Sequence, residues 1–390
     1  MSRLRKKKRE KMSKIKIFHV LTDTNIGGAG RVLIQFLKSY RRDLFDVTVL
    51  LPRGAELLSL VEAENVPVIL TEHGGDKSFD RGAVAEYRKI FKKERPDIVH
   101  THSSLSARIA AYTSGVKSRI YTRHCTFDMP RKLTSFPGKQ INGFVNNRLA
   151  TRIIAVAYSA AENLTDTGVS EKKITVIMNG VSPLRSVTED EKAALRESLG
   201  IRTGDFVCGI SARLEPYKGH AYLLDAAKKI AGTADGDRIK FVVMGTGSEE
   251  ETLKKRVADE GLRSVVFTGL VKDVAPYYCI MDLQLNCSYG TEATSISLCE
   301  GMSIGLPALV TTFGGNPYVI EDGVNGMTVP PRDSEAMAEK ILKAASDPAL
   351  MEELREGANR VYSEKFTARS MTEQMEKIYL EEAKRIGKEP

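Results

Sequence analysis

Residues 288–326 read SYGTEATSISLCEGMSIGLPALVTTFGGNPYVIEDGVNG, and this stretch carries the strongest indication of fold and function in the chain. Glu292 and Glu300 lie eight positions apart, an apolar run then ends at Leu306-Pro307, and the next strand breaks at Gly314-Gly315. Two carboxylates on either side of a helix start can accept hydrogen bonds from a polyol. Glycines at a strand end allow the backbone to come close to a ligand. The pattern therefore predicts a sugar-binding turn in an α/β domain.

Short β-branched runs alternate with amphipathic helical stretches along the chain, which is the pattern of parallel α/β sheets. Strands are predicted at residues 15–21, 46–51, 67–70, 97–100, 119–122, 152–156, 174–177, 206–210, 239–244, 265–268, 283–286, 308–311 and 326–329. Helices are predicted to begin near residues 29, 56, 81, 104, 141, 159, 219, 249, 273, 295, 317 and 334, before two terminal helices at 347–365 and 367–386. Ligands of such sheets bind at the carboxyl ends of the strands.

A turn-forming segment divides the chain near residues 180–190. Asn179-Gly180 followed by Pro183 ends a strand, and the polar stretch 184–191 comes next. A chain of 390 residues also exceeds the size of a single core. We therefore expect two doubly wound Rossmann-like domains facing each other across a cleft. Their predicted bounds are 15–182 and 183–365, with a basic tail at 1–14 and a last helix within 366–390.

The net charge of +8 belongs to the amino-terminal tail rather than to the fold. Residues 1–14 hold eight Lys or Arg and one Glu, which leaves 50 basic and 49 acidic residues elsewhere. That balance argues against a nucleic-acid-binding body. The tail is either a lipid-contacting segment or a disordered extension, and Met12 as a second start leaves open whether residues 1–11 are native. Since no apolar run approaches the ~20 residues of a membrane span and no signal peptide opens the chain, we expect a cytoplasmic protein, peripheral on the inner face of the membrane at most.

Two glycine-containing loops follow predicted strands and open predicted helices. The first, Thr22–Gly30, contains Gly27 and Gly28, and such a loop can cradle a phosphate with backbone N–H groups and the helix dipole. A tight strand-to-helix turn explains the same residues, and the spacing is not that of a dinucleotide-binding loop. The second loop contains Gly245 in Met244–Glu249, and the same two interpretations apply.

Two cations follow the first strand of the second half. In Ser211–His220, which reads SARLEPYKGH, Arg213 and Lys218 lie on a loop that turns toward the expected cleft. A diphosphate leaving group needs cationic donors, and an Arg fork with a Lys point charge supplies them without a metal. Two solvated surface cations are the alternative. The five cysteines form no Cys-x-x-Cys pair, and they and the histidines show no zinc-ligand spacing, so no metal site is predicted.

Three histidines lie at predicted strand ends of the first half. His100 and His102 share one face of a strand and look like a metal pair, but no third ligand is expected nearby, so a metal site is not predicted there. His124 follows the next strand, directly after Arg123, and is either a donor-site residue or a loop histidine without a role.

The segment 119–152 is basic and aromatic. It holds seven Lys or Arg, among them Arg123, Arg131 and Lys132, and a single acid, Asp128. Phe127, Met129, Leu133, Phe136 and Phe144 are interleaved with these cations. Interleaving of this kind fits an anionic membrane or a lipid-diphosphate acceptor, and a solvated basic surface explains it equally well.

Taken together, these motifs resemble those of the retaining glycosyltransferases of family four, group 1, over nearly the whole chain. The resemblance implies the GT-B fold, with the terminal helix crossing back onto the first domain. It implies that Glu300 binds the ribose and Glu292 the transferred sugar, and that Arg213 and Lys218 clamp the diphosphate. It places Gly27, Gly28, Gly245, Ser295 and His124 around the donor, and it implies that His100 and His102 line the acceptor side of the cleft. The chain has Glu-Ala-Thr-Ser where the family usually has Glu-Gly-Phe-Gly, which bears most on the sugar contact.

The resemblance also implies an activity. A hexose or N-acetylhexosamine would pass from a nucleoside-diphosphate sugar, UDP-sugar first, to a glycan or lipid-linked acceptor in polysaccharide or glycolipid synthesis, with no cofactor and no metal. A UDP-N-acetylglucosamine 2-epimerase-like enzyme and a non-catalytic nucleotide-sugar-binding subunit are the alternatives. Release of UDP with and without acceptors distinguishes the three.

Overall fold

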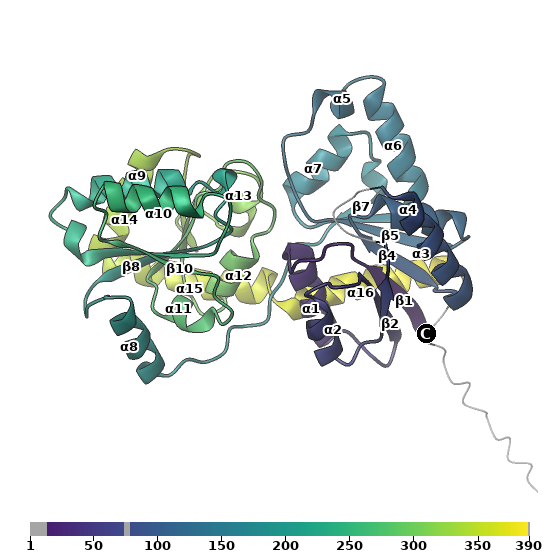
Figure 1. Ribbon diagram of the computed structural model, residues 1–390, viewed down its shortest axis with the longest axis horizontal. Helices are drawn as coiled ribbons and strands as arrows, with labels where there is room; N and C mark the ends of the chain where they lie inside the picture. The colour runs from purple at the N-terminus through teal and green to yellow at the C-terminus, as the bar shows by residue number, and fades with distance from the viewer. Residues whose placement is uncertain (1–13, 74–78, 389–390) are drawn as a thin grey trace, which may run out of the picture. The chain divides into compact units, whose positions relative to one another are not determined.

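The computed structural model describes residues 14–73 and 79–388 (Figure 1). The chain forms two compact units, one made of residues up to Arg123, Phe144–Ile154 and Thr372 onward, the other of His124–Gly143 and Ala155–Met371. The predicted basic tail lies outside the described residues except for Lys14. None of the helices within the described ranges is long and apolar enough to cross a bilayer.

The first sheet has seven strands in the order β3-β2-β1-β4-β5-β6-β7. Its strands are β1 (Ile15–Val20), β2 (Phe45–Pro52), β3 (Val68–Thr71), β4 (Ile98–His102), β5 (Ser118–Arg123), β6 (Arg152–Ala155) and β7 (Ile174–Val176). The strands from β3 through β5 pair in parallel, and the order reverses between β1 and β4, where His19 lies beside His100. Such a reversal is the topological switch point of a doubly wound sheet.

Helices connect these strands, as a parallel sheet requires. They are α1 (Gly28–Ser39), α2 (Leu58–Ala63), α3 (Arg81–Glu94), α4 (Leu105–Thr113), α5 (Arg131–Thr134), α6 (Gly138–Leu149), α7 (Tyr158–Asp166) and the 3-10 turn η1 (Glu171–Lys173). Phe18 and Val20 pack with α3 and α4 on one face of the sheet. On the other face, Tyr379 of the last helix meets Phe36 and Phe45 edge to face.

The second sheet has six strands in the order β10-β9-β8-β11-β12-β13, and all of its neighbours are parallel. Its strands are β8 (Phe206–Ser211), β9 (Ile239–Met244), β10 (Val265–Gly269), β11 (Leu283–Asn286), β12 (Ala308–Thr311) and β13 (Gly326–Val329). The strand order reverses between β8 and β11. This second switch point therefore lies between the loops that leave those two strands.

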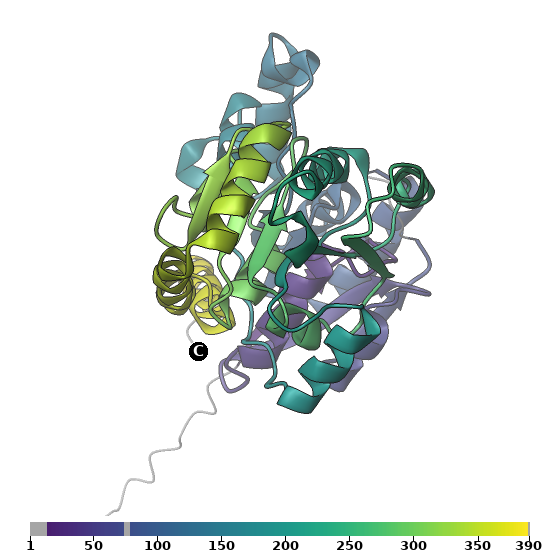
Figure 2. The same ribbon diagram turned by 90° about the vertical axis from the view of Figure 1, so that its left-hand side faces the viewer.

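Helices cover both faces of the second sheet (Figures 1 and 2). They are α8 (Glu189–Ser198), α9 (His220–Ala231), α10 (Glu250–Asp259), α11 (Ala275–Cys279), α12 (Ile296–Met302), α13 (Asn316–Val319), α14 (Ser334–Ser346) and α15 (Pro348–Lys365), with 3-10 turns η2 (Pro216–Lys218) and η3 (Gly236–Arg238). The last helix, α16 (Ala368–Arg385), belongs from Thr372 onward to the first unit. In Figure 1, α9, α10 and α14 lie on one side of this sheet and α8, α11 and α15 on the other.

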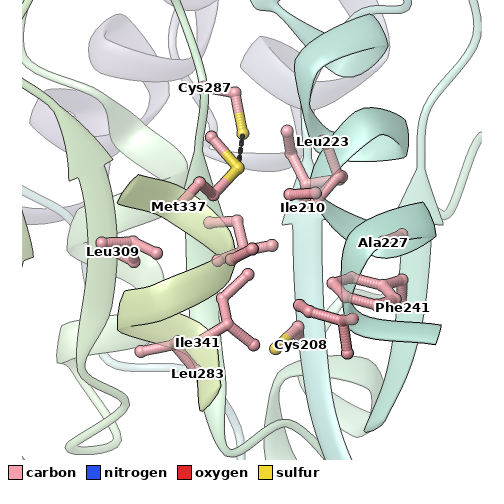
Figure 3. Close-up of a cluster of buried hydrophobic side chains, with 14 of the residues drawn as sticks. Cys208, Ile210, Leu223, Ala227, Phe241, Leu283, Cys287, Leu309, Met337 and Ile341 are labelled. Carbon is pink, nitrogen blue, oxygen red and sulfur yellow. Dashed lines mark hydrogen bonds between the residues drawn. The ribbon is translucent and has the colours of Figure 1, made fainter. Parts of the chain in front are cut away.

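The two-residue repeat of the strands sorts the core of the second unit into layers. Cys208 and Ile210 of β8 point into the layer under α9 and α14, where they meet Phe241 and Ile341 (Figure 3). Val207 points the opposite way, into the layer under α11. Successive side chains of a strand face opposite sides, so continuous apolar runs are what a sheet covered on both faces needs.

Each predicted strand is present within one or two residues of its expected bounds. Two helices were missed, α5 and α8, and the stretch 184–191 predicted as a polar connection ends inside α8. Helix α8 begins with a capping box in which the Thr188 side chain accepts from the Glu191 backbone and the Glu191 side chain accepts from the Thr188 backbone. The Thr-x-x-Glu spacing was therefore a readable signal for this helix.

Candidate functional site

The switch point of the second sheet joins two loops. One follows β8 and runs through Arg213 and Lys218 to the start of α9, and the other follows β11 and runs through Glu292 to α12. The backbone N–H of Tyr289 donates to the Tyr217 carbonyl at 2.9 Å, which ties the loops together. The ends of two neighbouring strands thus hold the predicted cations and carboxylate in one place.

Glu292 is the centre of this site. Its side chain is 10% exposed, and its Oε2 accepts from Lys218 Nζ at 2.8 Å, Asn286 Nδ2 at 3.1 Å and Ser288 Oγ at 2.7 Å. Its Oε1 accepts no hydrogen bond from any residue that the structure describes. Three donors therefore fix one oxygen of the carboxylate while the other keeps its hydrogen-bonding capacity for a ligand hydroxyl.

The two predicted cations lie on the same loop but in different surroundings. The side chain of Lys218 is 15% exposed. Its Nζ donates to Glu292 Oε2 at 2.8 Å and to the Thr291 carbonyl at 3.4 Å, which uses two of its three N–H donors. Arg213 is exposed, and its Nη2 donates to the Tyr217 hydroxyl at 2.7 Å. The ion pair between Lys218 and Glu292 was not predicted, since the sequence assigned the two residues to separate parts of the donor.

Glycines let the loops of the site pack backbone against backbone. Gly219 has φ +75°, and a Cβ there would lie 2.0 Å from the Cys287 carbonyl oxygen. A Cβ on Gly314 or Gly315 would lie 2.4 Å from the Glu292 carbonyl oxygen or 2.2 Å from that of Ala293. These glycines make room for the backbone that carries Glu292. The predicted approach of their backbone to a ligand stays a prediction.

The remaining donor-site predictions of the second half fall on neighbouring elements. Gly245 directly follows β9, and its N–H donates to the Gly269 carbonyl at 2.8 Å. Ser295 occupies the N-cap position of α12, but its side chain makes no capping bond; its hydroxyl lies 3.0 Å from that of Ser297. Glu300 lies partly buried on α12. The structure therefore assembles Lys218 and Glu292 directly and places Gly245, Ser295 and Glu300 on adjoining elements without testing their roles.

One residue beside Lys218 escaped the sequence reasoning. His220 opens α9, is 3% exposed, and has no hydrogen-bond partner for either ring nitrogen among the described residues. Burial first, and then the charge of Lys218, lower its pKa to about 4, which keeps the ring neutral. A buried polar group without a partner is rare and marks a place where a ligand can supply the bond. Its position directly after Lys218-Gly219 was the available signal.

His124 lies in the second unit by its contacts and is partly buried. Burial lowers its pKa to about 4, so its ring is neutral at physiological pH. Arg131 and Lys132 open α5, and both are exposed. Gly27 and Gly28 belong to the first unit, where Gly27 is the N-cap of α1 and no side chain caps the helix. A Cβ added at either glycine would meet nothing within 4 Å, so the space in front of that helix start is open.

The switch point of the first sheet holds a buried chain of polar side chains. His19 Nδ1 and His102 Nε2 are 3.0 Å apart, and His19 Nε2 lies 3.3 Å from the Tyr379 hydroxyl. That hydroxyl lies 2.7 Å from His100 Nδ1, whose Nε2 is 2.6 Å from Thr122 Oγ1. Each member can donate and accept, so the groups form one continuous hydrogen-bonded chain.

This cluster corrects two predictions about His100 and His102. The expectation that no third ligand lies near them was wrong, because the register of β1 against β4 brings His19 alongside. The expectation that they line an open cleft also differs from the structure, since their exposures are 0% and 4%. One ring nitrogen of each of the three histidines lies within 4.8 Å of the other two, and the rings of His100 and His102 are stacked at 23°.

A cavity of about 1030 Å³ lies at the opposite end of the second unit, near the start of β8 and the residue before β11. Arginines on its wall are already engaged: Arg202 pairs with Asp205, and Arg355 pairs with Asp282. Because ligands of open α/β sheets bind at the carboxyl ends of strands, the switch-point site is the better candidate.

Comparison with known proteins gives matches to both halves of the chain. Residues 26–185 match the family model described as Glycosyltransferase Family 4, and residues 191–361 match Glycosyl transferases group 1. An Escherichia coli UDP-Gal:alpha-D-GlcNAc-diphosphoundecaprenol alpha-1,3-galactosyltransferase is 28% identical over 87% of this chain and 90% of its own. An alpha-monoglucosyldiacylglycerol synthase from Acholeplasma laidlawii is 26% identical over 76% of this chain and 78% of its own.

Solved structures share the architecture. A glycosyltransferase from Rickettsia africae superposes with a TM-score of 0.80 at 21% identity, over 95% of this chain and 99% of its own. Anabaena HepE in complex with UDP superposes with a TM-score of 0.78 at 22% identity, over 94% of this chain and 99% of its own. Two doubly wound parallel sheets and these neighbours establish the GT-B fold. With both of its halves matched, the chain belongs to the group 1 glycosyltransferases of family 4.

Proposed function

We propose that the protein transfers a hexose or N-acetylhexosamine from a UDP-sugar to a lipid-linked or glycan acceptor, with retention at the anomeric carbon. The observation that carries the proposal is the Glu292 carboxylate, held at Oε2 by Lys218, Asn286 and Ser288 and open at Oε1. UDP is chosen because the Escherichia coli relative is named for UDP-Gal and the Anabaena neighbour was solved with UDP. A lipid-linked acceptor is chosen because that relative acts on a diphosphoundecaprenol.

In this proposal the second unit binds the donor. Glu292 Oε1 accepts from a hydroxyl of the transferred sugar, and Glu300 accepts from the ribose. Lys218 uses its remaining donor on the diphosphate, and exposed Arg213 contacts it from the outer side of the loop. His220 donates to the same anion, which would satisfy a buried ring that otherwise has no partner. His124 and the Gly245 loop, which belong to the same unit, complete the surroundings of the donor there.

The chemistry follows from where charge develops. As the bond from the anomeric carbon to the diphosphate oxygen breaks, negative charge grows on the leaving group. Fixed cations therefore stabilise the leaving group more in the transition state than in the bound substrate. The acceptor oxygen forms the new bond on the same face while its proton passes to the departing phosphate oxygen. Glu292 is ion-paired and hydrogen-bonded, which suits it to orient the sugar rather than to attack it.

A donor screen tests the proposal. Purified protein is incubated with UDP-, GDP- and ADP-sugars, with and without prenyl-diphosphate and glycolipid acceptors, while nucleotide release is followed. We expect UDP release that requires an acceptor and is unchanged by EDTA, and an α-linked product in the proton spectrum.

Three results would contradict parts of it. A 2-epimer formed without acceptor would identify an epimerase. Tight UDP binding without release from any donor would identify a binding subunit. Loss of activity with EDTA, restored by Mg²⁺, would contradict the proposal that transfer needs no metal.

A further inference from the structure

Three large apolar side chains are exposed within nine residues of the chain. Phe136 is 81% exposed, Ile141 61% and Phe144 71%. The first lies between α5 and α6, and the other two lie on α6 (Figure 1). Single exposed apolar side chains are ordinary, but several gathered on one short segment indicate an interaction surface.

Helix α6 is held firmly by its opposite face. Asn142 Nδ2 donates to the Thr167 carbonyl at 2.8 Å, and a Cβ added to Gly143 would lie 2.2 Å from the Gly168 carbonyl oxygen. Asn146 Oδ1 accepts from Arg108 Nη1 at 2.6 Å. Ile141 and Phe144 are three residues apart and so share a different face of the same helix. Their exposure is thus a fixed property of an anchored helix.

The cations of this segment divide into engaged and available ones. Arg119 donates to the Val116 and Leu149 carbonyls, Arg148 stacks on Tyr112, and Arg152 pairs with Glu381. Arg131, Lys132 and Lys139 have no ion-pair partner among residues 14–73 and 79–388. No Asp or Glu occurs between residues 129 and 161. The segment that exposes the apolar side chains therefore also carries cations without an ion-pair partner among the described residues.

We propose that the α5–α6 surface, formed by Arg131, Lys132, Phe136, Lys139, Ile141 and Phe144, docks on an anionic lipid bilayer. The two phenylalanines and Ile141 would enter the boundary between headgroups and acyl chains, while the three cations face lipid phosphates. A protein partner fits less well, because lysines are depleted at the core of protein interfaces. The proposal goes beyond sugar transfer and does not depend on it, since docking requires neither donor nor acceptor.

The absence of tryptophan from the sequence allows a site-specific test. Phe136→Trp and Phe144→Trp each place one fluorophore on the surface without removing its apolar character. Leu270→Trp, at a position that is 71% exposed in the second unit, is the matched control. Vesicles of phosphatidylcholine with or without phosphatidylglycerol are added, including brominated phosphatidylcholine as a depth-sensitive quencher.

We expect blue-shifted, bromine-quenched emission from Phe136→Trp and Phe144→Trp with phosphatidylglycerol vesicles, and unchanged emission from Leu270→Trp. The same response from all three variants, or none from any, would overturn the proposal. These variants keep a large apolar side chain at an exposed position, so the fold is not at risk.

A charge test uses vesicle co-sedimentation of the full chain. Neutralising Arg131, Lys132 and Lys139 to Gln should lower partitioning roughly a hundredfold, at about fivefold per cation near an anionic surface. The same change at exposed Lys228, Lys255 and Lys343 is the control. The amino-terminal tail is present in every variant, so its own lipid affinity cancels in the comparison.

Equal binding by both triple variants would overturn the proposal. So would a Phe136→Ser/Phe144→Ser variant that binds vesicles like the wild type but sediments as a smaller assembly, because the surface would then join protein copies. A selective loss of vesicle binding in the α5–α6 variants supports it, whatever the outcome of the donor screen.

Discussion

The two sheets place histidines or charged residues at the same topological position, yet their switch points differ in chemistry. Between β8 and β11, Lys218 and Glu292 form an ion pair, and Glu292 Oε1 accepts no hydrogen bond from the residues that the structure describes. Between β1 and β4, His19, His100 and His102 form a buried hydrogen-bonded chain with the hydroxyl of Tyr379. The position at a switch point therefore does not by itself make a ligand site. Whether other side chains cover that position decides if a ligand can bind there.

Coverage explains the contrast in physical terms. Tyr379 of α16 lies against Phe36 and Phe45 and brings its hydroxyl to two of the histidines. Burial then disfavours the charged imidazolium, and each ring nitrogen must find a neutral partner. At the second switch point the loops pack on each other through Gly219 and leave charged groups at the strand ends. The first switch point is closed by packing, and the second carries the candidate site at its strand ends.

The largest expected effect is at the charged switch point. Lys218→Ala should lower kcat/KM by roughly 30- to 1000-fold, since one preorganised donor to a developing anion contributes about 2–4 kcal/mol. Glu292 keeps its bonds from Asn286 and Ser288, so the melting temperature should change little. Kinetics of acceptor-dependent UDP release and thermal denaturation measure the two quantities. Lys228→Ala on the exposed side of α9 is the control, and equal rates for both variants would remove Lys218 from the site.

The covered switch point should respond in stability instead. Tyr379→Phe keeps the ring packing but removes the hydroxyl that lies 2.7 Å from His100 Nδ1 and 3.3 Å from His19 Nε2. Leaving buried polar groups unpaired costs about 1–3 kcal/mol in the free energy of unfolding. Urea denaturation measures this loss, while kcat/KM should stay within about twofold of the wild type. Unchanged stability would show that the chain of hydrogen bonds contributes nothing.

Acid should weaken the covered switch point further. Burial lowers the pKa of His19 to about 3, against 6.5 for an ordinary histidine. Below pH 6.5 His19 therefore binds a proton in the unfolded chain but stays unprotonated in the folded protein. The free energy of unfolding consequently falls as the pH falls toward 3. Between pH 6.5 and 5 the loss amounts to about 2 kcal/mol. His19→Gln cannot titrate, so its stability should depend less steeply on pH; an identical slope would contradict the assignment.

The strands could be predicted from sequence because buried parallel strands are continuous apolar runs, such as Ile239–Met244. The pairing of residues across neighbouring strands could not be predicted, because the register of two strands is set only when the sheet assembles. His19 and His100 lie 81 positions apart in the chain, and only the register of β1 against β4 makes them neighbours. The third histidine was missed for that reason.

The candidate site was predictable in its residue types but not in its contacts. Lys218 and Glu292 were identified through their motifs, whereas the ion pair between them and the donors Asn286 and Ser288 depend on how two loops fold onto each other. The close approach of Gly314-Gly315 to the backbone of Glu292 and Ala293 likewise depends on how the loops fold. Helix α8 was missed although Thr188 and Glu191 stand at capping-box spacing.

The smallest predicted effect separates the two cations of the charged switch point. Tyr217→Phe removes the hydroxyl that accepts from Arg213 Nη2 at 2.7 Å but keeps the ring beneath the guanidinium. One such hydrogen bond contributes about 0.5–1.5 kcal/mol, so kcat/KM should fall roughly two- to tenfold if it holds Arg213 against the diphosphate. Tyr222→Phe, on the ring that meets Tyr289 edge to face, is the matched control. Should Tyr217→Phe and Arg213→Ala both retain full activity while Lys218→Ala does not, the diphosphate is bound by the buried cation alone. The difference in side-chain exposure between Arg213 and Lys218 would then match a difference in function, with the buried cation binding the diphosphate.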